Sequence, residues 1–194
     1  CLHGQLFLVD AGGFRGGYSA ETLESLAHTA KKHGVNYIVI ESNSGDGMFS
    51  SLFQPVLGKI HPCTTEEVRH SKQKELRIID TLEPVLNQHR LIVDPKVIER
   101  DYDTSVGYAG EVGGEQAEKY SLFYQMSRLT RDRGSLLHDD RLDALSIVIH
   151  YWIESLARDV EGAAESHREA LIMEELEKFM DGAIGSRRKE PTWM

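Results

Sequence analysis

The sequence has few of the features that mark secreted, membrane-spanning or zinc-binding proteins. Its 194 residues include two cysteines, Cys1 and Cys63, whose separation argues against a disulfide framework or a zinc site. No apolar run approaches the ~20 residues of a membrane helix, and no secretory signal pattern is present. The G-x-x-x-x-G-K-[ST] pattern of a P-loop is also absent, which excludes an ATPase of that class within this sequence. These absences favour an intracellular, reducing setting and no membrane partner.

The charge balance is acidic. The net charge of −9 argues against a protein that coats nucleic acid through a generally basic surface. It leaves room for a nuclease, because an acidic metal site adds negative charge and DNA contacts can be local. Hydrophobic residues make up 40% of the chain, enough for a core. We expect one domain over residues 1–158, followed by an extension over residues 159–194.

The first third of the chain alternates strand and helix patterns, which predicts an α/β fold. Residues 5–10 indicate a strand, and the glycine-rich stretch 11–17 indicates a loop. Ser19 is a suitable N-cap for a helix that ends at Gly34. Residues 35–41 are almost continuously apolar, as in a buried central strand. A helix is expected over residues 48–60, where Pro55 disturbs or splits it.

The later elements are less regular. We expect a strand over residues 64–70, a helix beginning at residues 71–75, a strand over 91–94, a flexible polar excursion over 101–119, and a short strand or helix over 120–129. The apolar side of the helix after residue 71 is expected to hold Leu76, Ile79, Leu82 and Leu86. An acidic amphipathic helix is expected over residues 165–180, and a disordered basic end over residues 182–194.

Residues 136–156 combine three acids with a helical apolar stripe. The stripe consists of Leu145, Val148, Ile149, Trp152, Ile153 and Leu156. Asp139, Asp140 and Asp143 lie at the start of this helix, and Asp140 and Asp143 are neighbours on one face, mostly opposite the stripe. One interpretation is an acidic cap that suits the helix dipole. The other is a divalent-metal site, since carboxylate oxygens bind Mg²⁺ and Mn²⁺.

A second acid on another element favours the metal interpretation. Glu41 ends the apolar run 35–40 and precedes a polar, glycine-rich loop, the place where open α/β sheets carry their chemistry. A fold that joins this strand end to the start of the late helix would form a carboxylate cluster for one or two metal ions and phosphodiester hydrolysis. Asp10 also follows a strand, but it is better explained as a turn-starting residue.

Four segments resemble a known family. LFLVDAGGFRGGYS, VIESNSGDGMFSSL, EEVRHSKQKELRIIDTLEPVLNQHRLIVD and LLHDDRLDAL are similar to the C-terminal nuclease domain of the large terminase subunit of podovirus-type tailed phages. The resemblance covers residues 5–150. Its long third segment is specific, whereas the acidic helix is shared with many RuvC-like and RNase H-like nucleases.

The resemblance implies an RNase H-like (RuvC-like) mixed sheet flanked by helices, and an endonuclease that uses Mg²⁺ or Mn²⁺, as two ions, to cut concatemeric double-stranded DNA during packaging. It implies that Glu41 is the second metal-binding acid and that Asp140 and Asp143 form the later pair, with Asp139 as an adjacent candidate. The family's basic segment corresponds to residues that would contact DNA phosphates: Arg69, His70, Lys72, Lys74 and Arg77. The implied partners are DNA, an ATPase domain, the portal and the small terminase, in the cytoplasm of a bacterial host.

The sequence departs from the family at its beginning. The family's first metal-binding Asp lies on a strand before the one that corresponds to Leu6–Asp10, and residues 1–5 do not supply it. We therefore expect a nuclease domain that lacks its first strand and is impaired in cleavage. Three alternatives stay open: a non-catalytic interaction module, a RuvC-like junction resolvase, and an α/β domain with acidic helix caps only.

Overall fold

The computed structural model describes residues 4–14, 16–42, 47–109 and 115–185. It is an α/β structure, as predicted, and it divides into two compact units, Cys1–Tyr151 and Trp152–Met194. The predicted domain boundary between residues 158 and 159 stays a prediction. None of the helices in the described ranges is both long and apolar enough to cross a membrane.

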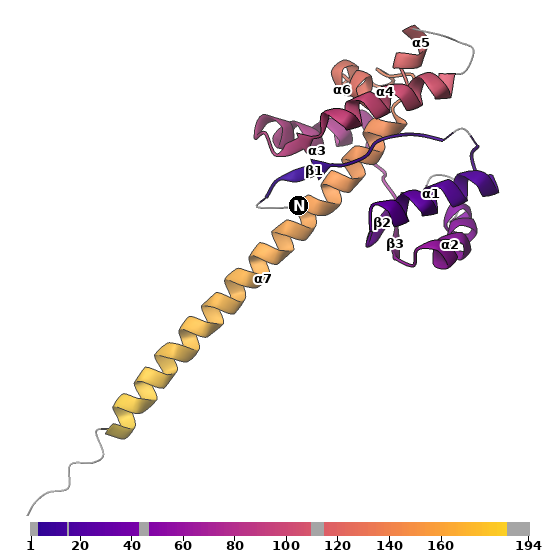
Figure 1. The fold of residues 1–194 in the computed structure, drawn as a ribbon. Coiled ribbons are helices and arrows are strands. Elements are labelled where there is room, and N and C mark those ends of the chain that lie inside the picture. Colours follow the sequence, from indigo (N-terminus) through magenta and orange to yellow (C-terminus); the bar gives the residue numbers. More distant parts are fainter. Residues whose placement is uncertain (1–3, 15, 43–46, 110–114, 186–194) are drawn as a thin grey trace, which may run out of the picture. The chain divides into compact units, whose positions relative to one another are not determined.

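The first unit contains two parallel strand pairs (Figure 1). Strand β1 (Leu6–Leu8) pairs with β4 (Leu91–Val93), with Leu6 opposite Leu91. Strand β2 (Tyr37–Glu41) pairs with β3 (Thr64–Val68), so that Glu41 lies opposite Val68 at the end of the pair. Both pairs are parallel and they are separate in the described ranges, so the mixed sheet of a RuvC-like arrangement stays a prediction.

Helices α1 (Ala20–Lys32) and α2 (Met48–Ile60) pack with β2 around one core. The side chain of Ser19 accepts a hydrogen bond from the Thr22 N–H, as expected of the N-cap. Gly34 follows the helix end with a φ of +58°, which glycine adopts without a Cβ clash. The buried core residues are Leu23, Ala27, Ala30, Ile40, Phe53 and Leu57.

Two predictions for this region are wrong. Strand β2 is not buried along its length: Ile40 is buried, whereas its other residues are partly exposed. The reason is that the α1–α2 layer packs on the strand face that carries Ile38 and Ile40. Pro55 does not split α2, which is continuous from Met48 to Ile60 with the proline inside it.

The remaining elements of the first unit are α3 (Lys74–Asn87), α4 (Pro95–Ala109), α5 (Glu115–Glu118), α6 (Leu122–Arg128) and the start of α7 (Asp140–Gly185). The flexible excursion predicted over residues 101–119 is wrong for its described part, because α4 and α5 occupy much of it. Asp101 and Ser105 on α4 are buried, and Asp101 is ion-paired with Arg141. Residues 120–129 form a helix rather than a strand.

Two predicted helix faces are also corrected. Helix α3 buries Leu82, as predicted, but its other buried residues are Glu75, Ile78 and Val85 rather than Leu76, Ile79 and Leu86. The buried Glu75 accepts a hydrogen bond from the Gly134 N–H. On α7 the buried apolar residues are Leu142, Leu145, Ile147 and Ile149, whereas Val148 and Trp152 are exposed. Asp143 is buried among them rather than opposite the core.

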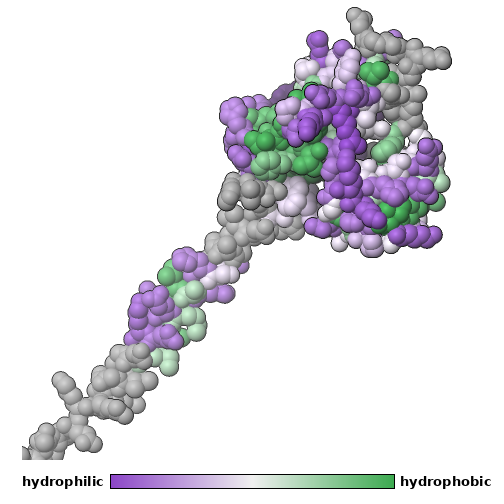
Figure 2. Space-filling model, in the orientation of Figure 1, coloured by the Kyte–Doolittle hydropathy of each residue, from purple (hydrophilic) through white to green (hydrophobic). Residues whose placement is uncertain are grey.

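The second unit consists of the continuation of α7 to Gly185. The helix predicted over residues 165–180 is therefore part of one longer helix. The side chains of residues 165–180 are exposed, including Leu171, Ile172, Leu176 and Phe179. Figure 2 shows hydrophobic and hydrophilic surface side by side on this segment. Residues 186–194, most of the basic end for which disorder was predicted, lie outside the described ranges.

Candidate active site

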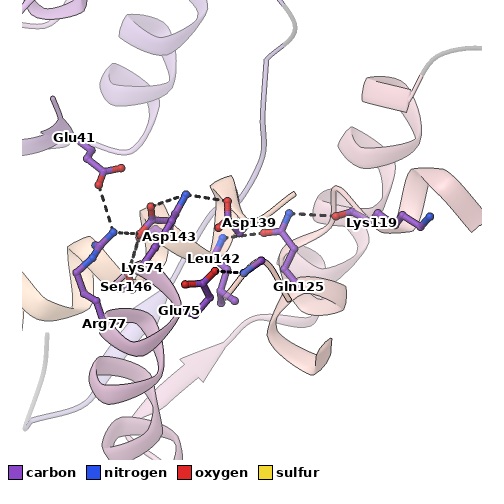
Figure 3. Close-up of polar contacts among 11 residues, drawn as sticks. Glu41, Lys74, Glu75, Arg77, Lys119, Gln125, Asp139, Leu142, Asp143 and Ser146 are labelled. Carbon is purple, nitrogen blue, oxygen red and sulfur yellow. Dashed lines mark hydrogen bonds and ion pairs between the residues drawn. The ribbon is translucent and has the colours of Figure 1, made fainter. Parts of the chain in front are cut away.

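Acids from two distant elements meet on one arginine of α3 (Figure 3). Glu41 ends β2, and Asp143 lies in the first turn of α7. Arg77 Nη2 donates to Asp143 Oδ1 at 2.7 Å and to Glu41 Oε1 at 3.3 Å. All three side chains are largely buried, with exposed fractions of 12% for Arg77, 18% for Glu41 and 4% for Asp143. The predicted meeting of the strand end with the helix start is present, with a guanidinium between the two acids.

Lys74, one turn before Arg77 on α3, binds the same cluster from its other side. Its Nζ lies 2.8 Å from Asp139 Oδ1 and 3.0 Å from Asp143 Oδ2. Burial lowers the pKa of Lys74, but hydrogen bonds to Asp139 and Asp143 outweigh it and raise the pKa above its ordinary value. The ammonium is therefore charged at neutral pH. The cluster contains three carboxylates and two cations, so its charges nearly balance.

Ser146, Glu75 and His70 are further polar residues near this cluster. Ser146 Oγ donates to the main-chain oxygen of Asp143 at 2.8 Å, one turn along α7. The backbone N–H of Gly134 donates to Glu75 Oε1 at 2.6 Å and lowers the pKa of that carboxyl. Burial, followed by the charge of Arg77, lowers the pKa of His70, whose Nε2 is buried without a hydrogen bond from the described residues. His70 is accordingly neutral at pH 7.

The cluster is open to solvent on the Glu41 side. Glu41 lines a pocket of about 320 Å³ that is bounded by the start of α2 and the end of β3, including Gly47, Phe49 and Glu67. A hollow of this size beside a carboxylate accommodates part of a substrate. Asp143, by contrast, is enclosed by α3 and α7.

The structure separates Asp140 from the other acids. Asp140 is exposed and lines a different pocket with Arg141, while Asp139 and Asp143 contact Lys74. Of the basic residues predicted to contact DNA, Lys74 and Arg77 bind the acids, and Arg69 and Lys72 are exposed just before α3. A DNA-binding role for these residues stays a prediction.

The carboxylate oxygens of the cluster are suitable ligands for a hard divalent cation. The present distances between these carboxylates are set by Lys74 and Arg77. Asp143 Oδ2 is buried, and the Lys74 ammonium lies 3.0 Å from it. Carboxylate oxygens are the ligands that Mg²⁺ and Mn²⁺ prefer. Within the described ranges, no three side chains of Asp, Glu, His or Cys lie close enough together to hold a metal ion. Binding of an ion by these acids thus requires the two cations to move.

Sequence reasoning missed several residues that organise this region. Arg141 lies between the predicted acids and forms a buried pair with Asp101 at 2.5 Å. Gln125 Oε1 accepts a hydrogen bond from the Leu142 N–H at 3.0 Å and so caps the first turn of α7. Asp10, interpreted as a turn residue, binds His33 Nε2 at 2.7 Å and Arg100 Nη1 at 2.6 Å. For Arg141, its place in the sequence among Asp139, Asp140 and Asp143 was the one feature that could have indicated a role in this region.

The fold and the cluster together define an α/β domain in which an acid at a strand end and an acid at a helix start share one arginine. Residues 1–91 match the family described as "Terminase Bacteriophage T7, Ribonuclease H-like domain". This stretch contains Glu41, Lys74 and Arg77, whereas the acids of α7 lie beyond it.

A named relative of the chain is a terminase subunit. The chain is 45% identical over 176 residues to the "Terminase, large subunit" of Enterobacteria phage T3, and the alignment covers 91% of this chain. It spans about 29% of the length of that relative. The chain is therefore similar to this terminase large subunit over most of its own length.

Proposed function

We propose that this chain is the nuclease part of a phage terminase large subunit and hydrolyses concatemeric double-stranded DNA during packaging, with Mg²⁺ or Mn²⁺ as cofactor. The observation that carries the proposal is the sharing of Arg77 Nη2 by Glu41 and Asp143. Two carboxylates that are distant in the sequence, buried and aimed at one cation form a preorganised acidic site. The substrate class is taken from the resemblance to the terminase family, which the 45% identity to the T3 large subunit supports.

Glu41, Asp139 and Asp143 are the residues that would hold the metal. A bound divalent ion at such a site lowers the pKa of an attacking water and stabilises the leaving oxygen of a phosphodiester. Asp140 stays a candidate ligand by the resemblance, although its side chain lines another pocket here. One or two ions are consistent with this set of oxygen donors.

The chain's own cations have a separate part in the proposal. Lys74 and Arg77 neutralise the buried carboxylates, which would otherwise repel one another at close range. When these cations are displaced, their N–H groups become available to the negatively charged oxygens of a DNA phosphate. Arg69 and Lys72, exposed before α3, would contact phosphates further along the duplex and position it without reading its sequence.

The resemblance further suggests that the ATPase domain, the portal and the small terminase act with this domain. A second candidate function is an interaction module without catalysis. It is favoured by the exposed apolar residues Ile172, Leu176 and Phe179, which lie at helical spacing on α7. It is also favoured by the ion pairs that already neutralise the acids.

The test is metal-dependent nicking of supercoiled plasmid by the chain, with Mn²⁺ and with EDTA. Glu41→Gln removes one carboxylate charge while keeping the shape of the side chain. Glu67→Gln is the matched control, because Glu67 lines the same pocket but has no contact with Arg77. We expect the wild type and Glu67→Gln to nick the plasmid with Mn²⁺. The nicking rate of Glu41→Gln should be at least about 100-fold lower, the effect typical of removing a group that stabilises the reacting centre.

A folded wild-type chain that does not nick would refute catalysis by this chain and favour the interaction module. Equal loss in both variants would show that the pocket, rather than the cluster with Arg77, carries the effect. Circular dichroism of each variant establishes that the comparison is between folded proteins.

A further inference from the structure

We propose that a second pocket, at the start of α7, binds a single guanine base. The pocket has a volume of about 300 Å³ and is lined by the loop after β1, the chain before α6 and the first turn of α7. Its lining includes Gly12, Gly13, Phe14, Tyr120, Asp140 and Arg141. This volume lies at the lower end of the range for small-molecule sites, which suits one flat ring.

Arg141 supplies one charged N–H group, Nη2, that donates to no side chain or main-chain oxygen among the residues the structure describes. Its side chain is only 8% exposed. Its Nη1 is fully engaged, with Asp101 Oδ1 at 2.5 Å and Thr104 Oγ1 at 3.0 Å. Its Nη2 is buried and donates to no residue in the described ranges. Buried donors are almost always satisfied, so this N–H group points to an acceptor atom on a ligand that enters the pocket.

The charges of the pocket select a neutral ligand. Asp101 neutralises Arg141, which leaves the exposed carboxylate of Asp140 as an excess negative charge. No hydrogen bond or ion pair to the Asp140 side chain occurs within the part of the chain that the structure describes. A free phosphate would be repelled by this carboxylate. A neutral ring that offers an oxygen acceptor to Arg141 and N–H donors to Asp140 satisfies both groups.

Guanine is the DNA base with this combination. Its Watson–Crick edge carries O6 as acceptor beside two adjacent donors, N1–H and N2–H, which a carboxylate can accept together. Adenine, cytosine and thymine each lack two adjacent donors on that edge. Asp140 and Arg141 both line this pocket, so one planar edge within it can face both side chains.

Aromatic side chains give the pocket flat apolar surface. The ring of Tyr120 is held by stacking on His138, with centroids 4.0 Å apart and planes 26° apart. Phe14 lines the pocket from the loop after β1. Stacking on aromatic rings is tolerant of base identity, so discrimination rests on Asp140 and Arg141. The inference rests on the proposed function in taking DNA as the source of the base, which must leave the duplex to expose its edge.

Gly13 allows a sharp test. A Cβ at this position would lie 3.3 Å from Arg141 Nη2 and 3.4 Å from its Nε, so Gly13→Ala places a methyl group against the unsatisfied donor. Gly58→Ala is the matched control, because a Cβ at Gly58 meets nothing within 4 Å. Asp140→Asn is a second variant, which exchanges one of the two acceptors for a donor and requires no change in packing.

The experiment is a titration of the full chain with guanosine, adenosine and inorganic phosphate, in EDTA, followed by backbone NMR and equilibrium dialysis. We expect guanosine to shift the Gly12 and Gly13 signals and to bind at least about fivefold more tightly than adenosine, the least that a bidentate pair contributes. Gly13→Ala should lose this binding, Gly58→Ala should retain it, and Asp140→Asn should lose the preference for guanosine.

Equal binding of the two nucleosides would overturn the proposal, as would retention of guanosine binding by a folded Gly13→Ala chain. Phosphate shifting the same signals without guanosine doing so would also overturn it and assign an anion site instead. Nucleoside binding requires neither metal nor Glu41. If the chain does not nick plasmid, the nucleoside titration can still be interpreted. If guanosine does not bind, the conclusion from the nicking experiment is unchanged.

Discussion

The Arg77 bridge yields a stability prediction that can be worked from the structure. Arg77→Met removes the cation between Glu41 and Asp143 and keeps a side chain of similar length. Breaking a buried ion pair on one side costs about 3–5 kcal/mol. Two features reduce this energetic cost. Lys74 still lies 3.0 Å from Asp143 Oδ2. The buried Nε of Arg77 has no hydrogen-bond partner among the described residues, so the substitution also removes the cost of burying that unsatisfied donor. We expect a net loss of about 2–3 kcal/mol.

Thermal unfolding followed by circular dichroism measures this loss. For a chain of this size, about 1 kcal/mol lowers Tm by about 2–4 °C, so Arg77→Met should lower Tm by roughly 4–12 °C. Arg131→Met is the matched control. Arg131 also bridges two carboxylates, those of Asp80 and Glu83, but its side chain is 60% exposed. An exposed bridge contributes at most about 1 kcal/mol.

A metal arm separates a metal site from a structural ion-pair network. With Arg77 absent, Mn²⁺ can take its place between the acids, and a ligand at 100 times its Kd stabilises by about 2.7 kcal/mol. Mn²⁺ should therefore restore most of the Tm lost in Arg77→Met. Wild type should gain less, because its guanidinium must first be displaced. No greater gain in Arg77→Met than in Arg131→Met would refute metal binding by these carboxylates. Equal Tm values without metal would refute the bridge.

Three further predictions follow from burial and pKa. Glu75→Gln should make the stability of the folded chain fall less steeply in acid. The Gly134 N–H lowers the folded pKa of Glu75, so the carboxylate stabilises the fold above its unfolded pKa and this stabilisation is lost as pH falls through the folded pKa. Urea unfolding between pH 5 and pH 3 measures the difference. Leu142→Ala should destabilise by about 2–5 kcal/mol, because Leu142 is fully buried, whereas Leu137→Ala, 81% exposed, should change urea-unfolding stability little. Cys63 should react slowly with iodoacetamide at pH 8 in the folded chain and quickly in urea, because burial raises its pKa.

Local pattern was sufficient for much of the fold. The cap at Ser19, the end at Gly34 and the apolar periodicity of residues 48–60 depend on near neighbours, and the structure has them as predicted. The flexible excursion failed because the polarity of residues 101–119 was interpreted as solvent exposure. Asp101 and Ser105 are buried there, which is possible because Arg141 and the main chain satisfy them.

Of the predicted acids, Glu41 and Asp143 share Arg77, whereas Asp140 lines another pocket, and the place of the two cations was not predicted. Glu41 and Asp143 stand out in the sequence because each lies at an element end. Lys74 and Arg77 were interpreted as DNA contacts, since nothing in a linear pattern tells whether a basic side chain turns toward solvent or toward a carboxylate. The buried face of α3 decides this, and apart from Leu82 it lies one residue before the predicted face, with Glu75 and Ile78 buried in place of Leu76 and Ile79.

The position of the acids on α7 depends on contacts outside the stretch that matches the RNase H-like family. The first turn of α7 is fixed by the buried side chain of Leu142 and by Gln125, whose Oε1 accepts the Leu142 N–H while its Nε2 donates to the Lys119 carbonyl. Asp143 follows Leu142 directly, so a shift of this turn would move Asp143 away from Arg77. Helix α6, which carries Gln125, thus positions an acid that it does not itself contribute. The site therefore depends on the whole first unit, because residues 1–91 by themselves contain Glu41, Lys74 and Arg77 but not Asp139 and Asp143.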